Sequence, residues 1–149
     1  MQGWVIRIGI IAVIAIGALV LRDRLSGNAA ELKVGDCFDE PASSATKVED
    51  VQHHPCTEAH DNEVLIVTAH PAAKNAAYPT EAEMSAFVDD KCVSAYKPYT
   101  GSEAATESEI GLAWYVPTKE GWTSGTRKVI CYLYRVDKAK MTATLHAAP

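Results

Sequence analysis

The sequence has 149 residues, with 14 Lys and Arg against 19 Asp and Glu, a formal net charge of -5, 22% charged residues and 48% hydrophobic residues. This length and this apolar share fit one folded domain with a short appendage, and they exclude a disordered chain. The 9 Gly and 7 Pro follow no G-X-Y period and the chain has no heptad run, which excludes collagenous and coiled-coil proteins.

The first 25 residues are unlike the rest of the chain. Every residue from Ile8 to Leu21 is apolar or Gly. A helix from Trp4 to Leu21 would span roughly 27 Å, close to the thickness of the hydrocarbon core of a bilayer. Arg22 follows the apolar run directly, where a cleaved secretory signal would need small uncharged residues. We therefore expect residues 1–25 to form an uncleaved N-terminal membrane anchor with a single transmembrane helix.

The cysteines indicate on which side of the membrane the remainder lies. All four follow the anchor, at Cys37, Cys56, Cys92 and Cys131. An even number in a small domain, without a C-x-x-C pair, is typical of disulfides in an oxidising compartment rather than of a cytosolic zinc site. The Lys and Arg count around the segment, taken alone, favours the reverse orientation. We give the cysteines more weight and expect an extracytoplasmic domain in a single-pass protein of the cell membrane.

The charge distribution argues against nucleic acid as a partner. The anchor holds Arg7, Arg22 and Arg24 but only one acidic residue, Asp23, so the remainder is more acidic than the whole chain. Such a surface repels phosphate backbones, and the sequence has no basic stripe with interleaved aromatic residues. We expect no nucleic-acid partner.

A linker at residues 26–31 leads into a domain at residues 32–149, which is a common length for one hydrophobic core. The first strand candidate in this domain is Leu32–Phe38. A second, weaker strand is indicated by Val48 and Val51.

The clearest strand and the clearest helix come next. Glu63–Ala69 is an apolar run rich in β-branched residues, typical of a buried strand. T-E-A-E then supplies Thr80 as an N-cap and Glu83 three residues later, the two halves of a capping box. We expect this helix to end at Pro98–Gly101. Its apolar positions recur at three- and four-residue steps: Met84, Phe87, Val88, Cys92, Ala95 and Tyr96.

The C-terminal third predicts a hairpin. Its arms are Ile110–Val116 and Lys128–Val136, and Pro117–Thr126 connects them. In the second arm, strand geometry places Cys131 on one face with two aliphatic neighbours, and we expect that face to meet the helix. A last short strand at Met141–Leu145 is expected to add an edge to the sheet.

These elements predict an α+β domain in which an antiparallel sheet packs against one main helix. Four cysteines allow three pairings. We favour Cys92 with Cys131, because both are expected to point inward from the helix and from the strand beneath it, and this leaves Cys37 with Cys56.

Four segments of the sequence carry a resemblance to a known family. They are L-K-V-G-D-C-F-D (32–39), V-x-H-H-P-C-T-E-A-H-D-N-E-V (51–64), Y-P-T-E-A-E (78–83) and P-T-x-x-G-W-x-x-G-x-R-x-V-x-C (117–131). In this order and spacing they resemble the septum-formation domain family of actinobacterial envelope proteins. The resemblance implies a membrane-tethered, disulfide-bearing, extracytoplasmic domain with a link to cell division or envelope growth. It supplies no active site.

Metal-ligand residue types gather in one segment, at His53, His54, Cys56, His60, Asp61 and Glu63. A copper or zinc site built from His53, His54 and His60 is the alternative function. Against it, adjacent histidines in an extended segment point to opposite faces, and Cys56 is expected in a disulfide. We favour a polar loop in which His60 and Glu63 hydrogen-bond the backbone of the following turn, and we assign no metal or cofactor.

Catalytic motifs are missing from the sequence. A Cys–His nucleophile needs a free thiolate, which an oxidised cysteine cannot provide. The chain has no G-x-S-x-G elbow, P-loop, H-E-x-x-H or dinucleotide fingerprint. We expect no enzyme, no catalytic residue and no small-molecule substrate.

Two residues are candidates for contact with a partner, Trp122 and His60. Trp122 lies in the turn P-T-K-E-G-W-T-S-G, and turn aromatics can be exposed anchors. The other hairpin aromatics, Trp114, Tyr115, Tyr132 and Tyr134, are expected to pack in the core as cross-strand pairs. The sequence thus predicts a membrane-anchored, extracytoplasmic, non-catalytic interaction module that binds another envelope protein and is linked to septum formation.

Overall fold

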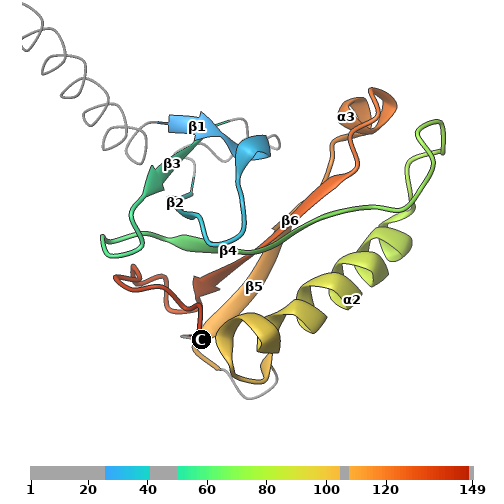
Figure 1. The fold of residues 1–149 in the computed structure, drawn as a ribbon. Helices are drawn as coiled ribbons and strands as arrows, with labels where there is room; N and C mark the ends of the chain where they lie inside the picture. The colour runs from blue at the N-terminus through green and yellow to red at the C-terminus, as the bar shows by residue number, and fades with distance from the viewer. Residues whose placement is uncertain (1–25, 41–49, 105–107, 148–149) are drawn as a thin grey trace, which may run out of the picture.

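A computed structural model of the chain describes residues 26–40, 50–104 and 108–147. Within them a 6-stranded antiparallel sheet has the strand order β1-β3-β2-β4-β6-β5 (Figure 1). The strands are β1 (Ser26–Asn28), β2 (Cys37–Asp39), β3 (Asp50–His54), β4 (Asn62–Ala69), β5 (Ile110–Tyr115) and β6 (Lys128–Arg135). The helices are the short 3-10 helix η1 (Ala29–Glu31), α2 (Glu81–Thr100) and α3 (Lys119–Thr123). The α+β class, with its antiparallel sheet and one main helix, is confirmed.

The expected membrane anchor at residues 1–25 lies outside the described residues. Among the residues that are described, no helix combines the length and the apolar character needed to cross a bilayer.

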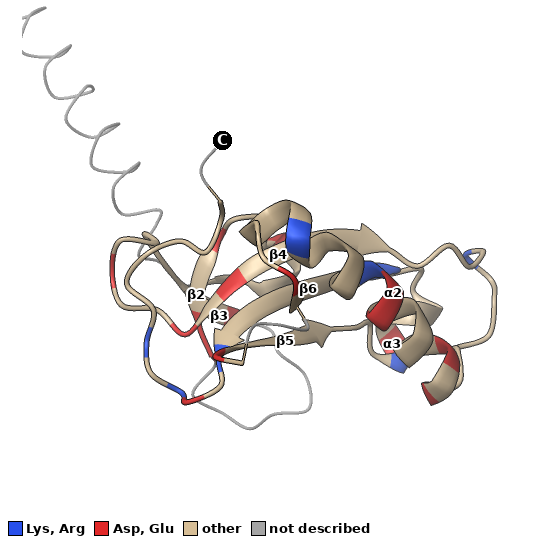
Figure 2. Ribbon diagram, turned by 90° about the horizontal axis from the view of Figure 1, so that it is seen from below, with Lys and Arg blue, Asp and Glu red and all other residues tan. Residues whose placement is uncertain are grey.

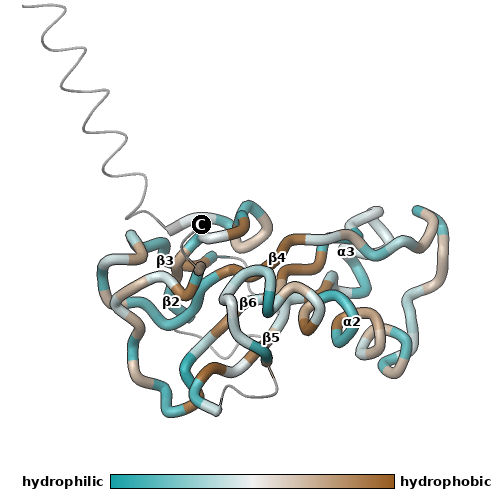
Figure 3. The backbone as a smooth tube through the Cα atoms, turned by 60° about the horizontal axis from the view of Figure 1, so that its bottom comes forward, coloured by the Kyte–Doolittle hydropathy of each residue, from teal (hydrophilic) through white to brown (hydrophobic). Residues whose placement is uncertain are grey.

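Two apolar clusters lie on opposite faces of β4 and β6. The helix-side core lies between these strands and α2, and consists of Leu65, Met84, Val88, Cys92, Tyr96, Tyr99, Trp122, Val129, Cys131 and Leu133. The strand-side core lies on the other face of β4 and β6, where these strands meet the β1–β3 region. It consists of Ala29, Leu32, Phe38, Val51, Val64, Ile130 and Tyr132. Figure 1 shows α2 and the β1–β3 strands on opposite sides of the long strands, and Figure 3 shows a strongly hydrophobic stretch in β4.

Alternation along β6 explains how one strand serves both cores. Val129, Cys131 and Leu133 belong to the helix-side core, and the residues between them to the strand-side core, as strand geometry requires. The predicted inward face of Cys131 is therefore confirmed. In β4 the pairing register shifts between Val64 and Ile66, a β-bulge that turns Leu65 as well as Ile66 toward α2.

The ends of α2 follow the sequence signals. The Thr80 side chain accepts a hydrogen bond from Glu83 N, and a Glu83 carboxylate oxygen accepts one from Thr80 N at 2.8 Å, so the predicted capping box is confirmed. Pro98 lies inside the last turn, and the helix continues to Thr100. Gly101 then closes it with a φ of 77°, a left-handed conformation that glycine adopts without steric cost.

Both disulfides form in the predicted pairing. Cys37 bonds to Cys56 with a Cα–Cα distance of 5.3 Å, and Cys92 bonds to Cys131 with a Cα–Cα distance of 5.7 Å. The second bridge joins α2 to β6 inside the helix-side core, where both of its cysteines are fully buried.

The first predicted strand is shorter than expected. The strand begins only at Cys37, because Lys33 N donates to the Asp36 carboxylate at 2.8 Å and Gly35 adopts a φ of 85°, so the chain turns there. The weaker strand is present as β3 and contains Val51. Val48, its other predicted member, lies outside the described residues.

The predicted last strand at Met141–Leu145 is wrong. Met141 makes a single antiparallel bridge with His60, and the pairing stops there. Leu145 N donates instead to the Glu63 carboxyl group at 2.8 Å, so a side chain takes the backbone group that a neighbouring strand would have used. The hairpin of β5 and β6 is confirmed, and its connection contains the unpredicted helix α3.

Candidate functional site

Trp122 lies in the interior, so the prediction that it is an exposed contact residue is wrong. Its side chain is 2% exposed, its Nε1 donates to Ala76 O at 2.8 Å, and the Arg127 guanidinium lies 3.6 Å from the ring centroid. Thr118 caps the short helix α3, accepting a hydrogen bond from Gly121 N at 3.1 Å, and this helical turn directs the indole inward. The T-x-x-G spacing after Pro117 was the signal for this cap.

Arg127, the arginine of the segment at 117–131, has a structural role that the sequence did not predict. Its guanidinium donates to the carbonyl oxygens of Ala73 and Lys74, each at 2.8 Å, and to Trp122 O at 2.8 Å. These hydrogen bonds hold the loop before α2 against α3. A guanidinium has enough donors to satisfy several carbonyl groups at once, which explains why an arginine suits this position.

His60 is also buried, so it offers no surface to a partner. It is 0% exposed, and its Nδ1 donates to Glu58 O at 2.7 Å, because a carbonyl oxygen can only accept. Its Nε2 has no hydrogen-bond partner within the described residues. The prediction that His60 is a contact residue is wrong, while its predicted hydrogen bond to backbone exists, to a preceding residue rather than to the following turn.

The structure does not bring together the three histidines of the alternative metal site. The His53 ring packs over Gly27, so closely that a Cβ there would lie 2.8 Å from Nε2, and His54 Nε2 lies 2.8 Å from an Asp39 carboxylate oxygen. Within the described residues, one cluster of three ligand-type side chains occurs, Cys37 with His60 and Glu63. In it the cysteine is consumed by a disulfide, so the cluster cannot offer a thiolate.

Glu63 is the centre of a buried polar cluster. It is 0% exposed, and it accepts hydrogen bonds from Tyr99 Oη at 2.5 Å, Thr144 Oγ1 at 2.6 Å and Leu145 N at 2.8 Å. Burial, followed by the hydrogen bond to Glu63, raises the pKa of Tyr99 well above its ordinary value. This cluster fastens the end of α2 and the C-terminal segment to β4, which is a structural task.

Asp39 is the centre of a partly exposed charge cluster. It receives hydrogen bonds from His54 Nε2 at 2.8 Å and from Lys140 Nζ at 2.6 Å, and Lys140 also lies 3.2 Å from Asp61. Burial alone would raise the pKa of Asp39, but the hydrogen bonds from Lys140 and His54 outweigh it and lower that pKa. A His–Asp pair can orient a base, but the chain has no thiol to activate, since all four cysteines are in disulfides.

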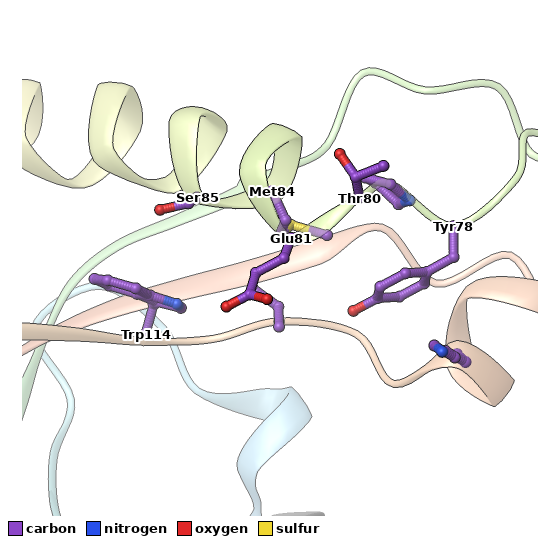
Figure 4. A pocket seen from close by; sticks show the side chains of 9 residues that line it. Tyr78, Thr80, Glu81, Met84, Ser85 and Trp114 are labelled. Carbon is purple, nitrogen blue, oxygen red and sulfur yellow. The ribbon is translucent and has the colours of Figure 1, made fainter.

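The best candidate for a binding site is a pocket of about 520 Å³ between the first turns of α2 and the end of β5. Figure 4 shows Glu81 projecting from α2 toward β5, with the rings of Trp114 and Tyr78 on either side of it. Trp114 is 40% exposed. It is the one aromatic residue among the exposed large hydrophobic residues of the described part of the chain. The pocket is lined by Tyr78, Pro79, Thr80, Glu81, Met84, Ser85, Trp114, Val116 and Lys119.

The prediction that Trp114 packs in the core is therefore wrong, and position in the sheet explains the error. β5 is the last strand, and α2 packs mainly over β4 and β6, so the outer strand is only partly covered. No cysteine or histidine lines the pocket. Its lining combines aromatic rings, the Glu81 carboxylate, the Lys119 ammonium group and three hydroxyl groups, a mixture that is typical of binding pockets.

Lys119 is the one basic residue among those that line this pocket. Figure 2 shows Lys and Arg at separated positions, interspersed with Asp and Glu.

Comparison with known protein families identifies a match. The model of the septum formation family matches residues 21–131, which is most of the chain and includes the four segments that carried the resemblance. No curated protein and no solved structure matches the chain. The chain belongs to the septum formation family.

Proposed function

We propose that this protein is a membrane-anchored, extracytoplasmic, non-catalytic interaction module that acts in septum formation by binding another envelope protein. The observation that carries the proposal is the pocket at Trp114, which joins an exposed aromatic ring to a concave surface. Exposed tryptophans in concave sites are common anchors of protein interfaces. Membership of the septum formation family supplies the cellular context.

Three further observations support the location and the lack of catalysis. Disulfides persist in oxidising compartments, so the two bonds support a domain outside the cytoplasm. The apolar run from Ile8 to Leu21 supports an anchor. The clusters at Glu63 and Asp39 use their polar groups to hold the fold together, which supports a binding role over a catalytic one.

The test is the position of the full-length chain in dividing cells. A C-terminal fusion to a fluorophore that folds after export should be enriched at the septum relative to a uniform membrane marker. Trp114→Ala should abolish this enrichment while the protein remains in the membrane. The matched control is Val93→Ala, because Val93 is 55% exposed on α2 and does not line the pocket.

A uniform membrane distribution of the wild-type protein would contradict the septal role. Septal enrichment that persists in Trp114→Ala would contradict the assignment of the pocket. A fluorescent signal only from fusions placed on the cytoplasmic side would contradict the topology.

A further inference from the structure

The outer edge of β5 has backbone groups available for pairing. β5 ends the sheet, and within the described residues no strand pairs with its outer side. Val136 N donates to Glu109 O at 2.9 Å, which makes these two residues a hydrogen-bonded pair. Because such pairs alternate in an antiparallel ladder, the N–H and C=O groups of Ile110, Leu112 and Trp114 point away from β6.

The sequence of this edge lacks the features that normally protect an edge strand. Natural sheets block their edges with charged side chains, with proline or with very short strands. β5 reads I-G-L-A-W-Y, without a charge or a proline, whereas β1 at the opposite end of the sheet has three residues, S-G-N. An unprotected apolar edge of six residues is suited to accept an additional strand.

A strand added here would have its side chains directed by the register of β5. Leu112 lies opposite Leu133, and Trp114 lies opposite Cys131, and both of these partners belong to the helix-side core. Residues opposite one another in a sheet point to the same face. The incoming residue that pairs with Trp114 therefore places its side chain beside the indole ring, on the side where α2 lies.

The carboxylate of Glu81 lies on that side of the sheet. Figure 4 shows it between the Trp114 and Tyr78 rings. Glu81 makes no ion pair or hydrogen bond with a described side chain, whereas Glu83, in the same helical turn, is used in the capping box. Lys119 contributes to the lining of the pocket but forms no ion pair with Glu81 in the described structure. A carboxylate next to aromatic rings attracts a cation through both its charge and the ring faces.

We propose that the pocket binds an extended segment of a partner protein, which pairs with the outer edge of β5 and places a lysine or arginine side chain between Trp114 and Glu81. This inference rests on the proposed function and names the chemistry of the partner. A second copy of this chain that paired through its own β5 would place no cation beside Trp114, because that strand has no basic residue.

The experiment uses the full-length chain in nanodiscs and measures binding by NMR. The probes are short capped peptides of alternating threonine and valine with a central lysine, norleucine or glutamate. The lysine peptide should bind about tenfold more tightly than the norleucine peptide, the ratio expected from one exposed ion pair together with one cation–π contact. The amide protons of Leu112 and Trp114 should become protected from solvent exchange on binding.

Variants and a backbone control separate the two parts of the proposal. Glu81→Gln should reduce the preference for lysine over norleucine, because the ion pair is lost while the cation–π contact with Trp114 remains. Asp89→Asn, an equal loss of charge on the same helix outside the pocket, should retain the preference. The lysine peptide N-methylated at alternate residues should not bind, because its edge can no longer donate hydrogen bonds to β5.

Several outcomes would overturn the inference. Equal binding of the lysine and glutamate peptides would contradict recognition of a cation. Undiminished binding of the N-methylated peptide would contradict pairing of an added strand with β5. Protection of β5 amides that grows with protein concentration, without peptide, would assign the edge to a second copy. Each of these can occur while Trp114→Ala still abolishes septal enrichment, in which case the proposed function stands and only the partner chemistry fails.

Discussion

The two disulfides stabilise regions of opposite character. Cys92–Cys131 lies within the helix-side core, where a helix of 20 residues packs on long strands. Cys37–Cys56 closes the region of β1, β2 and β3, whose strands have three, three and five residues. The buried polar side chains His60, Asn62 and Glu63 lie beside this second region. Short strands provide few ladder hydrogen bonds, so in this region polar contacts and a covalent bond add to the apolar packing of the strand-side core.

The strongest test of this comparison is to remove each bridge separately. Cys92→Ala with Cys131→Ala opens a loop with a sequence separation of 39, and should lower the free energy of unfolding by about 4 kcal/mol in the loop-entropy model. Cys37→Ala with Cys56→Ala opens a separation of 19 and should cost about 3 kcal/mol. Urea unfolding of the full-length chain in detergent measures both. A larger loss from the second pair would show that the short strands depend on their bridge more than the entropy of closure implies.

The next test is directed at the buried carboxyl group. Glu63→Gln keeps the size of the side chain but replaces one accepting carboxylate oxygen with a donating NH2 group. The three groups around it all donate hydrogen bonds to Glu63, so one of them would lose its acceptor. We expect a loss of about 2 kcal/mol in the free energy of unfolding, measured by urea titration.

The matched control lies at the adjacent residue. Both polar atoms of the Asn62 side chain are buried without a hydrogen-bond partner among the described residues, so Asn62→Leu removes a desolvation cost and should stabilise the fold by about 1 kcal/mol. Destabilisation by Asn62→Leu would show that this amide is bonded in solution, and an unchanged stability of Glu63→Gln would show that the cluster at Glu63 carries little weight.

The elements with local signals could be predicted from the sequence. The capping box at Thr80, the strand beginning at Glu63 and the alternation around Cys131 each depend on residues within one element. They were enough to predict the class of the fold and, through the facing positions of Cys92 and Cys131, both disulfides.

The features that depend on neighbours distant in sequence were missed. Trp122 is buried because the Ala76 carbonyl and Arg127 approach it from other segments, and Trp114 is exposed because its strand is the last in the sheet. Strand order and loop packing leave no periodic trace in a single sequence. The pocket depends on both, which is why the sequence alone pointed to Trp122 rather than to Trp114.

The smallest expected effect concerns the exposed polar contacts of the short-strand region. The lowered pKa of Asp39 means that its contacts with Lys140 and His54 favour the ionised carboxylate, despite a burial that opposes it. The stabilisation is therefore fully present above the ordinary pKa of 3.8 and is lost as the pH falls through the lowered value. Because Asp39 and Lys140 are partly exposed, Asp39→Asn should cost less than about 1 kcal/mol near neutral pH.

The difference between Asp39→Asn and the wild-type protein should shrink toward zero in urea titrations below pH 3.8. Lys140→Met should remove only part of the same pH-dependent difference, because His54 still contacts the carboxylate at 2.8 Å. A loss that stays constant with pH would assign the role of Asp39 to its hydrogen bond from Asp61 N at 3.1 Å. In that case the short-strand region would depend on backbone capping, with little contribution from its surface charges.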